Sequence, residues 1–302
     1  MLLRQSLIME YTNIDAYIPI DKTDTINKML MDLFYGRASD AIAFVTNYEP
    51  QDELPQDVKY AGLALQDWIA GEPVRVGQAG KLIRSLSFYS WNLGTSKDFI
   101  REGTLDNRYI CNDPRIITYS QRQLLELKDE TTQFASAKVL LGDHERLTDA
   151  PFKLVQAYDS FDEWHCARRD GKMWSTKSDI TLERQAHAMI EYVLTGDTDF
   201  PLVHPEDYCV GRSMGKITPE EGLIRWKRLQ NQESKRIDAT EVALTEAGSG
   251  LPITPRDHRV IMGGVLRQIK LGEQINAVYM HEVGKSWPQF PKFAEYLDQL
   301  RH

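Results

Sequence analysis

The sequence has few cysteines and no C-x-x-C pair. Cys111, Cys166 and Cys209 are scattered through 302 residues, which excludes a disulfide framework and indicates a reducing compartment. His165-Cys166 and His204 with Cys209 do not have the spacing of ordinary zinc ligands. We therefore expect no metal site and no cofactor.

Long apolar runs and an excess of positive charge are also missing. No segment reaches membrane-spanning length, and the first 13 residues are interrupted by Arg4, Gln5 and Glu10, unlike a signal peptide. The sequence thus predicts a cytoplasmic protein without a membrane contact. The net charge of −8 argues against a general nucleic-acid binder. Any anionic ligand must be held by a local cluster of cations.

What the sequence does contain is a folded composition, with 42% hydrophobic and 26% charged residues. Short apolar segments are predicted as strands at 16–20, 42–46, 74–76, 116–118, 163–168 and 275–279. Amphipathic helices are predicted at 26–35, 60–69, 81–91, 134–141 and 182–194, and Thr218-Pro219-Glu220-Glu221 has the pattern of a helix start. This alternation indicates a layered α/β or α+β protein.

The stretch 254–290 places charged residues at both ends of an apolar helix and strand. Thr254 is predicted to cap the helix, with Asp257 three residues later. Gly263-Gly264 would let the helix approach a neighbour closely. Arg259 and Lys285 then flank the packed segment. Taken alone, they are most simply interpreted as surface charges beside a solvated cap.

Two further helix starts have the composition of anion sites. The segment 77–81, GQAGK, is not a phosphate-binding P-loop, because Arg75 and Leu82 stand where that motif needs Gly and Ser or Thr. A glycine turn at a helix start can still bind an anion through backbone N–H groups. Thr131, Thr132 and Gln133 offer hydroxyl and amide groups before the next helix, although the two threonines could simply be caps.

Six short motifs, in order along nearly the whole chain, resemble those of the enolpyruvyl transferase family, in particular the 5-enolpyruvylshikimate-3-phosphate (EPSP) synthases. They are Asp21-Lys22-Thr23-Asp24-Thr25, Gly77-Gln78-Ala79-Gly80-Lys81-Leu82-Ile83-Arg84 (family G-N-A-G-T-x-x-R), Arg108, Thr131-Thr132-Gln133-Phe134 (S-S-Q-F), Glu233-Ser234-Lys235-Arg236 (E-T-D-R), and Asp257-His258-Arg259 with the later Val283-Gly284-Lys285-Ser286-Trp287-Pro288.

The chain also departs from the family. It is shorter, and the missing length falls mainly between Gln133 and Glu183. Other departures are Asn27 or Lys28 in place of an arginine, Arg228 in place of an asparagine, Gln232 in place of an acceptor-holding lysine, and Lys235 in place of an aspartate. These changes affect the acceptor side more than the donor side.

The resemblance implies a two-lobed fold of repeated strand-helix units, with 21–168 in one lobe and 1–20 together with 169–302 in the other. The donor, phosphoenolpyruvate, would be bound by Lys22, Gly80, Arg108, Gln133, Arg236, Arg259 and Lys285, with Asp257 and His258 on the same helix as Arg259. The acceptor side would comprise Thr23, Thr131, Thr132, Gln232 and Glu183. Lys22 and Glu233 would transfer protons, and Glu183 is a candidate base.

The implied enzyme moves the enolpyruvyl group of phosphoenolpyruvate to a hydroxyl of a small, anionic acceptor and releases phosphate. The acceptor would be shikimate 3-phosphate, as in the shikimate pathway of aromatic amino acid biosynthesis, or an altered acceptor. An alternative is a catalytically degenerate relative that binds an anionic metabolite or a protein partner. A structural protein with chance motifs is a third hypothesis, and it predicts that Arg236, Arg259 and Lys285 lie far apart. The oligomeric state stays open.

Overall fold

The computed structural model describes residues 14–127, 132–230 and 235–301, which divide into two compact units. Unit 2 comprises Ile20–Lys177, and unit 1 comprises the described residues before it together with those from Ser178 on. The lobe boundary predicted at 168 falls in the last turn of helix α8 (Phe152–Arg169), whereas the units divide after Lys177. Most of the described chain is helical, and the protein is broadly α+β.

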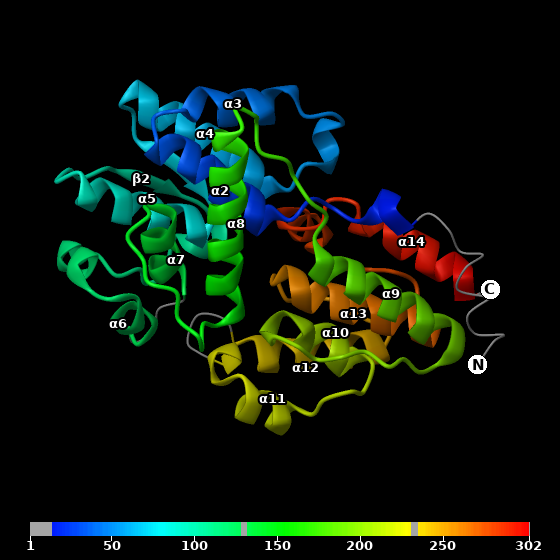
Figure 1. Cartoon of the computed structure of the whole chain (residues 1–302). Coiled ribbons are helices and arrows are strands. Elements are labelled where there is room, and N and C mark those ends of the chain that lie inside the picture. Colours follow the sequence, from blue (N-terminus) through cyan, green and yellow to red (C-terminus); the bar gives the residue numbers. More distant parts are fainter. Residues whose placement is uncertain (1–13, 128–131, 231–234, 302) are drawn as a thin grey trace. The chain divides into compact units, whose positions relative to one another are not determined.

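Unit 2 is a helical assembly with one small sheet (Figure 1). Its elements are α2 (Lys22–Phe34), α3 (Ala38–Asn47), α4 (Gln56–Ala70), β1 (Val74–Gly77), α5 (Gly80–Asn92), β2 (Phe99–Arg101), α6 (Gln121–Leu125), α7 (Gln133–Leu140) and α8, with short 3₁₀ helices at Gln51–Glu53, Gly103–Leu105 and Pro114–Thr118. Helix α2 packs against α3, α4 and α8, and α7 packs between α5 and α8. Buried side chains of these helices form one continuous core.

The sheet of unit 2 positions the glycine turn. Strands β1 and β2 pair in parallel, with Val74 opposite Phe99 and Arg75 opposite Ile100. Parallel strands need a crossover connection, and α5 supplies it. Residues 78–79 therefore turn the chain from the carboxyl end of a strand into the start of α5, the place where α/β units often bind ligands.

Several predicted strands are wrong. Segment 42–46 lies inside α3, and segment 163–168 lies inside α8. Segment 16–20 overlaps the end of the 3₁₀ helix Ile14–Tyr17, and segment 116–118 lies inside the 3₁₀ helix Pro114–Thr118. Segment 275–279 contributes only an isolated bridge between Ala277 and Ile253. Short apolar runs fit a helix or a strand equally well, so packing against neighbours decides between them. The strand predicted at 74–76 is confirmed as β1.

Unit 1 surrounds helix α13 (His258–Leu271), drawn in orange in Figure 1. Its other helices are α9 (Ile180–Thr195), α10 (Tyr208–Ser213), α11 (Pro219–Arg225), α12 (Arg236–Gly248) and α14 (Phe290–Arg301), with 3₁₀ segments at Ile14–Tyr17, Pro205–Asp207, Lys227–Gln230 and Met280–Lys285. Helix α13 packs most extensively on α12 and α10. A β-carbon at Gly263 would lie 2.7 Å from the Cys209 carbonyl oxygen, which confirms the predicted close approach.

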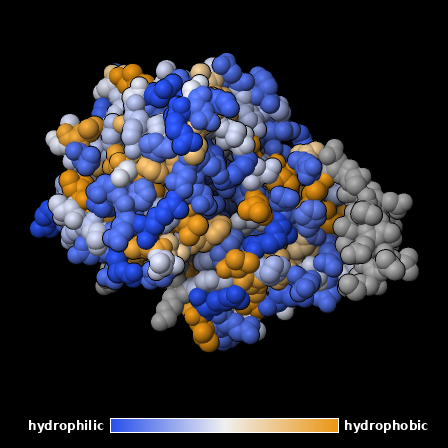
Figure 2. All heavy atoms as spheres, viewed as in Figure 1, coloured by the Kyte–Doolittle hydropathy of each residue, from blue (hydrophilic) through white to orange (hydrophobic). Residues whose placement is uncertain are grey.

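The face of the molecule drawn in Figure 2 is predominantly polar. Figure 2 shows hydrophilic side chains over most of the visible face, with apolar residues in small separate groups. No helix within 14–127, 132–230 and 235–301 is both long and apolar enough to cross a bilayer.

A buried carboxylate ties three segments of unit 2 together. Asp32, on α2, has no solvent exposure and accepts hydrogen bonds from the indole nitrogens of Trp164 and Trp174, both at 2.8 Å. Arg168 also donates to Asp32 and forms a second ion pair with Asp40 of α3 at 3.1 Å. Trp164 and Arg168 are four residues apart and therefore lie on one face of α8.

We predict that Asp32→Ala lowers the free energy of unfolding by about 3–5 kcal/mol, because three buried donors lose their acceptor. Asp32→Asn should cost less, since its amide oxygen still accepts. Urea denaturation measures both changes, with exposed Asp52→Ala as the control. A loss below about 1 kcal/mol for Asp32→Ala would contradict this role, because that is the range of ordinary surface substitutions.

Candidate functional site

The start of α5 brings together three residues that the resemblance assigns to the donor. A β-carbon at Gly80 would lie 3.4 Å from Arg108 Nη1 and 3.8 Å from Gln133 Oε1. Gly80 is the first residue of α5, and Gln133 is the first residue of α7. Two helix starts, a guanidinium group and an amide therefore meet in unit 2, and helix starts favour anions.

Arg84 is a fourth member of this group, which we name the Gly80 group: Gly80, Arg84, Arg108 and Gln133. Its side chain is only 1% exposed, and its Nη1 donates to Gln133 Oε1 at 3.0 Å and to the Gly80 carbonyl at 3.3 Å. Arg84 thus fixes the amide of Gln133 and adds a buried cation. Arg84 is part of the motif 77–84 but was not among the predicted site residues, although its place one turn after Gly80 was the available signal.

Lys22 and Thr23 open α2 in the same unit. Asp21 caps this helix, accepting from the N–H groups of Thr23 and Asp24 at 2.9 and 3.0 Å. Lys22 Nζ forms an ion pair with Asp57 at 2.8 Å. Asp57 was not anticipated, because it lies on α4 and nothing in the local sequence connects it with Lys22.

Lys28 does not substitute for the arginine that the family has near this position. It is 1% exposed, and its ammonium binds Asp24 at 2.7 Å and Glu163 at 2.6 Å. Asn27 is also buried and donates to Ser160 at 3.0 Å. Both side chains are therefore parts of the α2–α8 core and not ligand contacts.

Thr131 and Thr132, which precede α7, were predicted as acceptor contacts or as helix caps. Thr131 lies outside the described residues. Thr132 precedes the first residue of α7, but its side chain makes no capping hydrogen bond, so the interpretation of Thr132 as a side-chain cap is wrong. Thr132 is partly exposed and directly precedes Gln133 of the Gly80 group.

In unit 1, Arg236, Asp257 and Arg259 form a second group, which we name the Asp257 group. The Asp257 carboxylate accepts from Arg236 Nη2 at 2.8 Å and from the Arg259 backbone N–H at 2.9 Å. The Arg259 guanidinium forms an ion pair with Glu206 at 2.8 Å. The hypothesis of a structural protein with chance motifs predicts that Arg236, Arg259 and Lys285 lie far apart. Arg236 and Arg259 both act on Asp257, whereas no described contact brings Lys285 to them. His258 lies between them in sequence and also acts electrostatically on Asp257.

Asp257, and not Thr254, caps helix α13. Asp257 Oδ1 accepts from the N–H groups of Arg259 and Val260, and the helix begins at His258. Thr254 instead donates its hydroxyl to Glu246 at 2.5 Å. The predicted cap was wrong because an aspartate nearer the helix satisfies the same N–H groups.

Cys209 lies buried next to the Asp257 group. Burial raises the pKa of this thiol to about 11, although Arg236 and Arg259 act in the opposite direction. The thiol is therefore protonated at neutral pH, and it is not a candidate nucleophile.

The remaining predicted residues are not brought into either group by a described contact. Lys285 lies in the 3₁₀ segment Met280–Lys285 and pairs with Glu282 at 2.6 Å. Glu183 lies in the first turn of α9. Gln232 and Glu233 lie outside the described residues.

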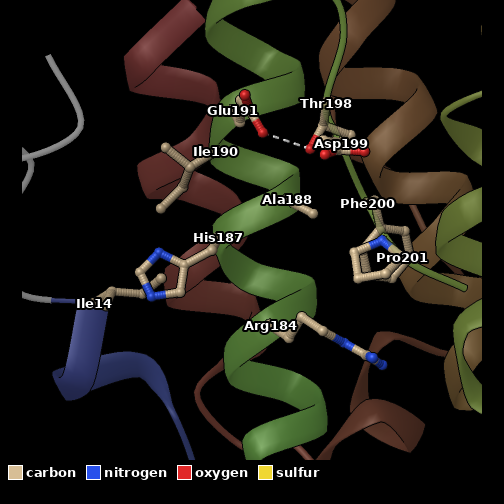
Figure 3. A pocket seen from close by; sticks show the side chains of 10 residues that line it. All are labelled: Ile14, Arg184, His187, Ala188, Ile190, Glu191, Thr198, Asp199, Phe200 and Pro201. Carbon is tan, nitrogen blue, oxygen red and sulfur yellow. Dashed lines mark hydrogen bonds between the residues drawn. The ribbon is translucent and has the colours of Figure 1, made fainter. Parts of the chain in front are cut away.

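A pocket of about 220 Å³ in unit 1 does not coincide with these groups (Figure 3). Arg184 points toward Phe200, 5.6 Å from its ring, and binds Asp207 at 2.5 Å. Thr198 donates to Glu191 at 2.7 Å. The ten lining residues include none that the resemblance assigns, so this pocket is not part of the candidate site.

Among the described residues, no three of the His, Cys, Asp and Glu side chains lie close enough together to hold a metal ion. Comparisons with protein-family models, curated proteins and solved structures found no match. The relation to the enolpyruvyl transferases therefore stays a prediction that rests on the six motifs.

We predict that Asp257 stabilises unit 1 only where it is ionised. Burial works in the opposite direction, but Arg236, His258 and Arg259 hold the pKa of this carboxyl well below its usual range. A carboxyl with a lowered folded-state pKa contributes stability above its unfolded-state value, about pH 4, and loses it as the pH falls below that value.

The free energy of unfolding of Asp257→Asn should accordingly lie about 2–4 kcal/mol below that of the unsubstituted protein at pH 7. The difference should shrink as the pH decreases from 4 to 2.5. Denaturant titrations across this range provide the measurement, with Asp298→Asn at a partly exposed carboxyl as the control. A difference that does not change with pH would refute the assignment.

Proposed function

We propose that the chain is an enolpyruvyl transferase-like enzyme that binds phosphoenolpyruvate and transfers its enolpyruvyl group to a small hydroxylated acceptor. The observation that carries the proposal is the Gly80 group. Gly80, Arg108 and Gln133 come from three separate motifs of the resemblance, and they meet at two helix starts of unit 2. Chance motifs would have no reason to converge.

The chemistry of the donor fits this composition. Phosphoenolpyruvate carries a carboxylate and a phosphate on three carbons, so it needs several fixed cations, and guanidinium groups bind such oxygens in bidentate geometry. The Gly80 group offers two guanidinium groups, an amide and backbone N–H groups. By the resemblance alone, Arg236 and Arg259 of unit 1 are also assigned to the donor; in the structure, Arg236 pairs with Asp257 and Arg259 with Glu206.

The proposed reaction proceeds in two steps. The acceptor hydroxyl adds to C2 of phosphoenolpyruvate as C3 gains a proton and the hydroxyl loses one. The tetrahedral intermediate then expels phosphate while C3 returns its proton, which restores the enol ether. By the resemblance, Lys22 and Glu233 move these protons, Glu183 is a candidate base on the hydroxyl, and the arginines stabilise the charge that develops.

One observation favours a second candidate function, binding of an anionic metabolite without turnover. Lys22, which the proposal uses for proton transfer, has its ammonium hydrogen-bonded to Asp57 at 2.8 Å. A lysine held in this way can serve as a fixed cation for a bound anion. The two candidates share the donor site and differ in the chemical step.

We predict that Arg108→Ala weakens phosphoenolpyruvate binding by about 10- to 100-fold, because a charge-assisted contact is worth about 1.5–3 kcal/mol. Arg236→Lys keeps a positive charge beside Asp257 but loses the bidentate geometry of the guanidinium group. Phosphoenolpyruvate binding should therefore weaken about 10-fold. Isothermal titration calorimetry measures both affinities. Arg115→Ala and Arg225→Ala, at exposed arginines of units 2 and 1, are the matched controls.

Turnover separates the two candidates. Incubation of the protein with phosphoenolpyruvate should release phosphate only when a suitable acceptor is added from a panel that includes shikimate 3-phosphate. Binding without phosphate release from any acceptor would support the second candidate. The absence of phosphoenolpyruvate binding by the unsubstituted protein would refute both.

A further inference from the structure

We propose that a pocket beside helix α13 in unit 1 binds a small carboxylate that also carries a hydroxyl group. The pocket has a volume of about 340 Å³, and its lining residues come from α9, α10, α12 and α13 and from the turn after α10. This volume lies at the lower end of the range of small-molecule sites, about 300–1,000 Å³. The proposal goes beyond enolpyruvyl transfer and does not rest on it.

The pocket is separate from the sites described above in unit 1. Of the residues that the structure describes, none lines both this pocket and the pocket in Figure 3, and no member of the Asp257 group lines it. Arg259 and Arg267 lie eight residues apart on α13, which corresponds to about 12 Å along the helix axis. Arg267, near the carboxyl end of α13, therefore belongs to a different surface of unit 1.

An arginine without a partner distinguishes this pocket. Arg267 lines the pocket and is half-buried. Within residues 14–127, 132–230 and 235–301, its side chain forms no hydrogen bond or ion pair. A half-buried guanidinium group binds a carboxylate in bidentate geometry, and such charge-assisted pairs are among the strongest hydrogen bonds in proteins. Arg267 is therefore the residue that we expect to bind the anionic group of the ligand.

The other two charged lining residues neutralise each other. Arg212 donates from Nε and Nη2 to the two carboxylate oxygens of Glu241, at 2.7 and 2.8 Å. Lys270 lies over the ring of Tyr192 but does not line the pocket. The lining residues thus carry one uncompensated positive charge, that of Arg267. A single carboxylate balances this charge, whereas a phosphate ester, with a charge of about −1.5 to −2, exceeds it.

Hydroxyl groups in the pocket wall explain the second feature of the ligand. Ser213 lines the pocket and is 4% exposed, and its Oγ has no hydrogen-bond partner in the part of the chain that the structure describes. Thr245 donates its hydroxyl to the Glu241 carbonyl at 2.8 Å, so its oxygen can still accept. A ligand hydroxyl would supply a partner to these groups, and Met214 and Leu244 would contact the carbon atoms.

Calorimetry of the full chain with lactate, glycerate and gluconate tests this proposal. We expect at least one of these hydroxy carboxylates to bind, and Arg267→Gln to weaken its binding by about 10-fold or more, because the charge-assisted contact is lost. Arg225→Gln, at an exposed arginine of unit 1 outside the pocket, is the matched control and should leave the affinity unchanged. Thermal unfolding verifies that both variants are folded.

Ser213→Ala provides a second, independent variant. It should weaken binding by about 3-fold, because the contact between the ligand and the serine hydroxyl is lost. It should not lower the melting temperature of the ligand-free protein, because the oxygen that it removes has no partner there. A melting temperature that falls while ligand affinity stays unchanged would show that this hydroxyl is structural and would contradict its assignment to the site.

Two further probes test which chemical group is recognised. The amide of the tightest hydroxy carboxylate, for example lactamide for lactate, keeps the shape without the charge and should not bind measurably. Glycerol 3-phosphate should bind more weakly than the carboxylate, and tighter binding would overturn the assignment to a carboxylate. If no hydroxy carboxylate binds, or if Arg267→Gln binds it as tightly as the unsubstituted protein does, the site is refuted. None of these results depends on phosphoenolpyruvate, so this site and the proposed function can fail separately.

Discussion

Each helix begins with backbone N–H groups that have no acceptor within the helix, and the way this protein satisfies them organises both of its units. Aspartates cap α2, α9 and α13 through Asp21, Asp179 and Asp257. Two of these carboxylates also bind a neighbouring helix: Asp21 binds Gln156 of α8, and Asp257 binds Arg236 of α12. The caps therefore fix tertiary structure as well as helix ends.

Helices α5 and α7 begin in a different way. Ala79 precedes α5 and has no polar side chain, and the side chain of Thr132 does not cap α7. Cations gather at these starts instead, with Arg84 and Arg108 near Gly80 and Lys81 on the next residue of α5. Uncapped helix starts surrounded by positive charge are well suited to bind a small anion. Because α3, α4 and α8 also begin without a side-chain cap, the gathered cations, and not the missing cap, mark this region as a candidate ligand site.

Some of this could be predicted from local sequence. The helix after residue 257, the close approach at Gly263 and the capping box of Thr218 and Glu221 all depend on residues near one another in the chain, and the structure has each of them. The strand at 74–76 and the glycine turn that follows it could also be predicted from residues near one another in the chain. Motif order also selected Gly80, Arg108 and Gln133, which meet, and Arg236 with Arg259, which share Asp257.

The failures depended on residues far apart in sequence. Segments 42–46 and 163–168 are apolar enough for strands, yet α3 and α8 are helices because of how they pack and because Trp164 and Arg168 both reach Asp32. The carboxylate partners of the predicted cations come from other elements or turns. Asp57 binds Lys22, Glu206 binds Arg259 and Glu282 binds Lys285, and no spacing rule connects the first two pairs.

The central claim is that the Gly80 group binds the donor of an enolpyruvyl transfer. A crystal structure of the full chain soaked with phosphoenolpyruvate tests it most directly. We expect density for the ligand against the start of α5, with its anionic oxygens within hydrogen-bonding distance of Arg108 and Gln133. Ligand density only elsewhere on the protein, or none at saturating concentration with this surface free of lattice contacts, would contradict the claim.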